Sequence, residues 1–275
     1  DAPPSSSDLA WPPTLFDELR PHVVLPARLG AEAVGAYFDV QPAELERMRQ
    51  RDEQLNPALL REFNYYVASF ETDRRIALHL LRTKPGVDAL VLFRLIDKMG
   101  HAALEYSELV DDHLRSKPEA VRRYGRVMTE AYRAVDRAVG ELGAAFGAGN
   151  VVVMSDHGFG LETTDERPPR RHYSHEEAPD GVFIATGPAF RAGRVDGLSV
   201  YDTLPLLLYL RGFPTAADQA GRVPREGFEP GCLDAHLETR IDSYCLQEQE
   251  VLSGGSAAVD AEETEHLRLL WYIPY

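Results

Sequence analysis

The chain contains 275 residues, of which 44% are hydrophobic and 27% are charged, a composition typical of a globular protein with enough apolar residues for a core. Its net charge of −15 and the lack of a basic stripe exclude a nucleic-acid duplex as a partner. No run of about 18 apolar residues occurs, which excludes a transmembrane helix. No signal peptide is evident, so we expect a cytoplasmic protein. Cys232 and Cys245 form neither a disulfide framework nor a zinc-binding pattern.

Proline and hydrophobic spacing predict the elements of the first half of the chain. Residues 1–25 are rich in proline and are expected to be an irregular lead or linker. Helices are predicted over 42–51 and 58–83, the second with apolar residues at three- and four-residue spacing. Residues 87–97, VDALVLFRLID, are so apolar that they favour a strand covered on both faces, as in a parallel sheet.

The second half continues this alternation of helices and strands. We predict, in chain order, a helix over 119–147, a buried strand over 150–155, a polar loop over 156–180, a strand over 180–188, a helix over 199–212 and a short closing helix over 261–270. Strands that alternate with helices are typical of an α/β fold. We therefore expect a largely parallel sheet flanked by helices.

Acidic and imidazole side chains follow two of the predicted strands. Asp97 ends the first strand and His101 comes four residues later, whereas Asp156 and His157 end the second strand. In open α/β sheets, sites lie beyond the carboxyl ends of the strands, so these side chains are expected at one edge. The loop before the next strand adds a third histidine, either His175 or His172.

Carboxylates and imidazoles of this kind suit Zn²⁺ or Mn²⁺. Each pair alone is weak evidence, because a strand-end Asp-His is more often a cap beside a surface imidazole. The combination at two strand ends predicts a metal site made by Asp97, His101, Asp156, His157 and His175. Arg170 and Arg171 are candidates for binding a substrate phosphate, although an ordinary solvated loop is the favoured explanation for them.

The motifs LIDKMGH, VVVMSDHGFG and H-x4-DGVFIATGP, in this order, resemble the alkaline phosphatase superfamily, and within it the type I phosphodiesterase/nucleotide pyrophosphatase-like phosphohydrolases. The segments YDTLPLLLYLRGFPTAADQAGRV and EETEHLRLLWYI extend the resemblance over nearly the whole chain. The resemblance implies a hydrolase of phosphate esters, a phosphodiesterase or phosphomonoesterase, that uses two divalent cations. One cation would be held by Asp97, His101 and His175, and the other by Asp156, His157, a further Asp and a Thr or Ser nucleophile.

The chain departs from the family pattern in its first 86 residues, where the βα unit that carries the nucleophile is not evident. Ser155, Thr163 and Thr164 lie near the motif but not at the family's nucleophile position. We therefore expect residues 26–275 to be a partial alkaline-phosphatase-like catalytic domain, with the nucleophile upstream. Exposed apolar surface is also expected, to be covered by the missing N-terminal piece or a second copy.

Three other functions compete with this interpretation. A non-catalytic metal-binding or interaction module is the main alternative, as a degenerate or fragmentary family member. A sulfatase would need a Cys or Ser in C/S-x-P-x-R, and neither Cys232 nor Cys245 has that context. A cofactor-independent phosphoglycerate mutase shares the metal ligands, but its inserted domain is not evident.

Overall fold

The computed structural model describes residues 10–38, 43, 57–110, 118–163, 171–176 and 178–244. Its contacts divide the chain into two compact units. The first unit comprises residues 1–146, 159–177 and 253–275, and the second comprises 147–158 and 178–252. The predicted helices over 42–51 and 261–270 lie outside the described residues, apart from Ala43.

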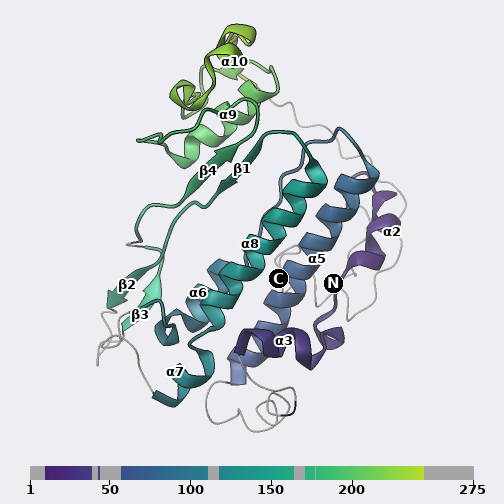
Figure 1. Cartoon of the computed structure of the whole chain (residues 1–275), viewed down its shortest axis with the longest axis vertical. Coiled ribbons are helices and arrows are strands. Elements are labelled where there is room, and N and C mark those ends of the chain that lie inside the picture. The colour runs from purple at the N-terminus through teal and green to yellow at the C-terminus, as the bar shows by residue number, and fades with distance from the viewer. Residues whose placement is uncertain are drawn as a thin grey trace. The chain divides into compact units, whose positions relative to one another are not determined.

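In its described residues, the first unit is mainly helical and contains a hairpin of two strands (Figure 1). Its helices are α2 (Leu15–Leu19), η1 (Arg20–His22), η2 (Pro26–Arg28), α3 (Ala31–Phe38), α5 (Pro57–Thr83), α6 (Leu95–Ala103), η4 (Leu104–Tyr106), α7 (Pro118–Tyr124) and α8 (Val127–Phe146), and its strands are β2 (Gly160–Thr163) and β3 (Arg171–Ser174). The helix predicted over 58–83 is confirmed by α5. The helix predicted over 119–147 is divided into α7 and α8 by a turn at Gly125 and Arg126.

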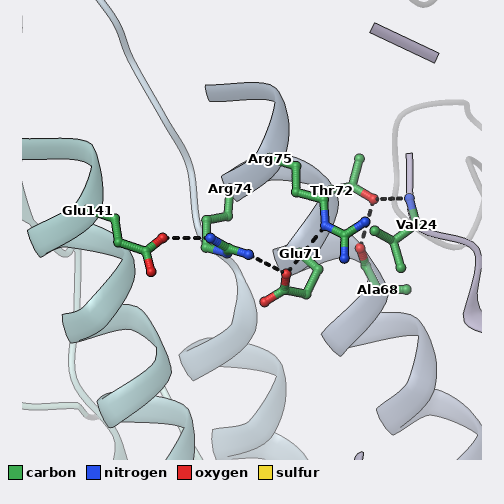
Figure 2. A network of polar contacts seen from close by, with 7 residues as sticks. All are labelled: Val24, Ala68, Glu71, Thr72, Arg74, Arg75 and Glu141. Atoms are coloured by element: carbon green, nitrogen blue, oxygen red, sulfur yellow. Dashed lines mark hydrogen bonds and ion pairs between the residues drawn. The ribbon is translucent and has the colours of Figure 1, made fainter. Parts of the chain in front are cut away.

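The core of the first unit lies between α5, α6 and α8, which pack side by side (Figure 1). Val67 of α5, Met99 of α6 and Met128 of α8 are all at most 2% exposed. Figure 2 shows how polar contacts bind α5 to its neighbours: Arg74 lies 2.8 Å from Glu71 on the same helix and 2.6 Å from Glu141 on α8. This packing gives α6 a fixed place on the helical core.

The proline-rich lead is more regular than its sequence predicts. Residues 15–22 form α2 and η1, and Phe16 of α2 is buried. The backbone N–H of Val24 donates to the hydroxyl of Thr72 on α5 at 2.9 Å, and that hydroxyl donates to the carbonyl of Ala68 (Figure 2). Burial of one aromatic side chain and these hydrogen bonds explain why this segment is ordered against α5.

The second unit contains the strands β1 (Val151–Met154), β4 (Phe183–Thr186), β5 (Thr215–Ala216) and β6 (Arg240–Ile241), and the helices η6 (Val200–Asp202), α9 (Thr203–Leu210), η7 (Arg225–Gly227) and α10 (Pro230–Ala235). The strands predicted over 150–155 and 180–188 and the helix over 199–212 are confirmed by β1, β4 and the η6–α9 pair. Its core includes Leu206 and Phe228, and Val152 and Phe183 pack against it.

The described strands do not assemble into the expected largely parallel sheet. They form three two-stranded sheets, of which β1–β4 and β2–β3 are antiparallel and only the short β5–β6 pair is parallel. Parallel strands need a long crossover connection, usually a helix. The described part of the link between β1 and β4 contains a hairpin instead of a helix. Mixed helices and strands remain compatible with an α/β fold.

The predicted buried strand over 87–97 is also wrong. Residues 87–94 form no regular element, and the side chains of Leu90 and Leu92 are 91% and 71% exposed. Residues 95–97 begin α6 instead, because Leu95, Met99 and Ala103 recur at the four-residue spacing of a helix and are buried. The expectation of exposed apolar surface is thus confirmed at this segment.

None of the described helices has the length and hydrophobicity needed to cross a bilayer.

Candidate metal centre

Asp97 and His101 lie one turn apart on α6. The amphipathic pattern of this helix buries Leu95 and Met99 and leaves the Asp97 and His101 side chains partly exposed. Nε2 of His101 lies 3.4 Å from Oδ1 of Asp97. Both side chains project from the same face because residues four apart on a helix are neighbours. Asp97 and His101 therefore reach their common position through a helix, not through the strand end expected from sequence.

His175 comes to the same place from the hairpin of β2 and β3. The ring centroids of His101 and His175 are 5.2 Å apart, with an angle of 81° between the ring planes. One carboxylate oxygen of Asp97 and one ring nitrogen of His175 lie within 4.8 Å of each other. Two ligands of one zinc ion, each about 2.0–2.2 Å from it, are separated by roughly 3–4 Å. Asp97 thus lies close to both His101 and His175, and it links the three side chains.

Glu162 of β2 holds the turn on which His175 lies. Its Oε1 accepts a hydrogen bond of 3.1 Å from the backbone N–H of Glu176. Its other oxygen, Oε2, lies 3.7 Å from Nε2 of His172 on β3. Of the two histidines that the sequence offered as a third ligand, His172 thus faces Glu162, whereas His175 lies beside His101.

Asp156 and His157 follow β1 in the second unit, as the sequence predicts. The backbone N–H of His157 donates to Oδ1 of Asp156 at 3.1 Å, and Nε2 of His157 lies 3.6 Å from the same oxygen. Nδ1 of His157 lies 3.0 Å from the carbonyl oxygen of Gly158. A carbonyl oxygen only accepts, so this contact requires a proton on Nδ1. A metal-binding histidine commonly donates its other ring N–H to a backbone carbonyl in this way.

Comparison with family models matches residues 6–195, more than half of the chain, to the type I phosphodiesterase/nucleotide pyrophosphatase family. The chain belongs to that family. The resemblance to the alkaline phosphatase superfamily is thereby confirmed. Comparisons with curated proteins and with solved structures returned no match.

Membership of the phosphodiesterase family associates the chain with hydrolysis of phosphate esters and with metal dependence. The matched region contains all five residues that the sequence suggests as metal ligands, namely Asp97, His101, Asp156, His157 and His175. The family also implies an alkaline-phosphatase-like fold.

The hydroxyl group of Ser155, next to the phosphodiesterase motif, has a structural partner. Oγ of Ser155 accepts a 3.0 Å hydrogen bond from the backbone N–H of Val182, which joins the end of β1 to the start of β4. Gly181 lies so close to this contact that an added Cβ would come within 2.1 Å of the Ser155 carbonyl oxygen. Thr163 ends β2 opposite Arg171, and Thr164 and Arg170 are outside the described residues.

Sequence reasoning missed three residues of this region. Glu162 was hidden in a segment interpreted as a loop, although GLET and RHYS alternate in the manner of short strands. Lys98 of α6 places its Nζ 3.2 Å from Oδ2 of Asp97 and supplies a positive charge at the site. Phe159 contacts the rings of both His101 and His175, and only the fold reveals these contacts.

Proposed function

We propose that this chain binds divalent cations and serves the hydrolysis of phosphate esters, either diesters or monoesters. The proposal is supported most directly by the closeness of Asp97 to His101 and to His175 within one unit, together with membership of the phosphodiesterase family. A single carboxylate and two imidazoles form a donor set that suits Zn²⁺ or Mn²⁺.

In this proposal Asp97, His101 and His175 hold one cation. Asp156 and His157 contribute to a second. When bound, such a pair of cations polarises phosphate oxygens and lowers the pKa of an attacking hydroxyl or water. Each aspartate supplies negative charge, and Nδ1–H of His157 donates a hydrogen bond to the Gly158 carbonyl. Arg170 and Arg171 are proposed to attract the substrate phosphate.

The test begins with cation binding. The 275-residue chain is treated with EDTA, exchanged into metal-free buffer and titrated with Zn²⁺ and Mn²⁺ by calorimetry. We expect His175→Ala to weaken binding strongly and His172→Ala, the matched control on the same hairpin, to leave it nearly unchanged. Equal losses in the two variants would contradict the assignment of His175.

The second part of the test measures turnover. Hydrolysis of p-nitrophenyl phosphate and bis-p-nitrophenyl phosphate is followed with added Zn²⁺ or Mn²⁺. Under the proposal, hydrolysis requires the cation and is lost in Asp156→Asn. Turnover that survives this substitution would rule out the two-cation assignment.

One observation favours a second candidate, a non-catalytic metal-binding module. The hydroxyl oxygen of Ser155, which lies next to Asp156, accepts a 3.0 Å hydrogen bond from the backbone N–H of Val182. The proposal assigns no nucleophile to this chain. Cation binding without turnover of either ester would support this module over the hydrolase.

A further inference from the structure

Phe159 lies against both imidazoles of the proposed first cation site. Its ring centroid is 5.1 Å from that of His101 and 6.5 Å from that of His175, with interplanar angles of 79° and 72°. The two imidazoles are themselves 5.2 Å apart at 81°. All three rings therefore meet edge to face, an arrangement that aromatic rings prefer and that restricts their rotation.

Gly100 of α6 provides the space for the Phe159 ring. A Cβ added to Gly100 would lie 2.5 Å from Cζ and 2.6 Å from Cε2 of Phe159. Glycine is unfavourable inside a helix compared with alanine, so its place in α6 needs a local reason. Close approach of the aromatic ring supplies that reason, and Gly100 directly precedes His101.

Phe159 is more than a core side chain. The two clusters of buried side chains that the described residues form do not include it, and the residue is only half-buried. A phenyl ring offers no ligand atom, so any effect on a cation must act through its neighbours. The residues that orient metal-binding histidines commonly change metal affinity by about 10–100-fold when they are replaced.

We propose that Phe159 is a positioning residue that holds the His101 and His175 rings in the orientation required by one cation. Gly100 leaves the space that the Phe159 ring occupies. This inference rests on the proposed function, because it assumes that these two imidazoles are ligands. Phe159 limits the rotation of each imidazole about its Cβ–Cγ bond through edge-to-face contact.

The test uses Phe159→Leu, Phe159→Ala, Gly100→Ala and the double variant Gly100→Ala/Phe159→Ala in the full 275-residue chain. Zn²⁺ affinity is measured by calorimetry, and Co²⁺ alone is added to record the visible absorption that reports ligand geometry. Gly140→Ala on α8 is the matched glycine control, because nothing lies within 4 Å of a Cβ at Gly140. Urea unfolding in EDTA identifies any variant that has lost its fold.

We expect Phe159→Leu and Gly100→Ala each to weaken Zn²⁺ binding about tenfold and to alter the Co²⁺ spectrum, while Gly140→Ala does neither. In Gly100→Ala/Phe159→Ala the loss of Zn²⁺ affinity should be clearly smaller than the product of the losses in Gly100→Ala and Phe159→Ala. The reason is that the double variant lacks the phenyl ring that the new methyl group would displace. Unchanged affinity and spectra in folded Phe159→Leu and Gly100→Ala would overturn the inference. If the losses of Zn²⁺ affinity in the two single variants multiply in the double variant, the proposed packing of Phe159 against Gly100 is wrong.

This outcome is distinguishable from a failure of the proposed function. If the unaltered chain binds neither Zn²⁺ nor Co²⁺, the cation site itself is wrong and the inference falls with it. If the unaltered chain binds both and His175→Ala abolishes binding, the site stands. The Phe159 and Gly100 variants then test only whether Phe159 positions the two imidazoles.

Discussion

Nε2 of His101 lies 3.4 Å from Oδ1 of Asp97, one turn away on α6, so a single helix presents a carboxylate and an imidazole as a preformed pair. Because both residues belong to one rigid element, their separation does not depend on a flexible loop. His175 joins the pair from the hairpin of β2 and β3, within 4.8 Å of Asp97.

Replacing Asp97 with Asn should weaken Zn²⁺ binding on the order of a hundredfold or more, because the site loses its charged ligand. Calorimetric titration of the metal-free chain measures the change. Asp136→Asn is the control, since Asp136 is an exposed carboxylate on α8. Similar losses of Zn²⁺ affinity in the two variants would show that Asp97 contributes only to the overall negative charge and is not a ligand.

Replacing Glu162 with Ala should lower the free energy of unfolding by about 1 kcal/mol and Zn²⁺ affinity by about tenfold. The backbone N–H of Glu176 loses its acceptor, and the turn that holds His175 is loosened. Urea unfolding and calorimetry provide the two measurements. Glu176→Ala keeps this backbone hydrogen bond and serves as the control. An unchanged Zn²⁺ affinity in Glu162→Ala would contradict the role of the turn.

Stability should fall as the pH drops below about 6.5 because of His22. Burial lowers the pKa of this ring below its usual 6.5, and the nearby His79 and Arg75 lower it further, against the opposing effect of Glu18. The two imidazoles are only 4.3 Å apart. The folded state favours neutral His22, so stability is complete above pH 6.5 and is lost as the pH falls towards the lowered value.

His22→Gln should therefore flatten the dependence of the urea midpoint on pH in this range. Hydrogen bonds from Lys84 and His79 lower the pKa of Glu18 below 4.5, so the titration of Glu18 acts at more acidic pH. Measurements above pH 5 thus separate the two groups. Equal slopes in the variant and the unaltered chain would exclude His22 as the cause.

Asp202→Ala should destabilise the second unit by about 1–3 kcal/mol, because removal of this buried carboxylate leaves two backbone N–H donors without an acceptor. Oδ2 of Asp202 accepts from the N–H of Ser199 at 2.9 Å, and Oδ1 accepts from that of Arg222 at 2.7 Å. Asp196→Ala is the matched control, since its exposed pair with Arg194 should contribute less than about 1 kcal/mol. Equal effects in denaturant unfolding would disprove this account.

Replacing both Leu90 and Leu92 with Lys should change the unfolding free energy by less than about 1 kcal/mol, because both side chains are already exposed. If this apolar segment drives self-association, the double variant should remain monomeric at concentrations at which the unaltered chain does not. Sedimentation at several concentrations checks this outcome. Leu95→Ala, which removes a buried side chain, should instead cost about 2–5 kcal/mol. A large stability loss in the double variant would show that the segment is packed.

The sequence alone predicts much of this protein because local periodicity carries much of the information. The spacing of Val67, Phe70 and Ala77 marks one buried face of α5, and the run before Asp156 marks β1. The four-residue separation of Asp97 and His101 likewise suggests a shared ligand position whether the segment is a strand end or a helix. These features depend on neighbours in the chain.

Other features required the tertiary structure. A short apolar run cannot be assigned to a strand or a buried helix from its pattern alone, and packing of Leu95 and Met99 against α8 decides for the helix. The antiparallel pairing of β1 with β4, the place of His175 beside His101 and the packing of Phe159 against Gly100 join residues that are distant in sequence. Such contacts depend on the tertiary packing of segments that are far apart in the sequence, and the local spacing of apolar residues does not specify that packing.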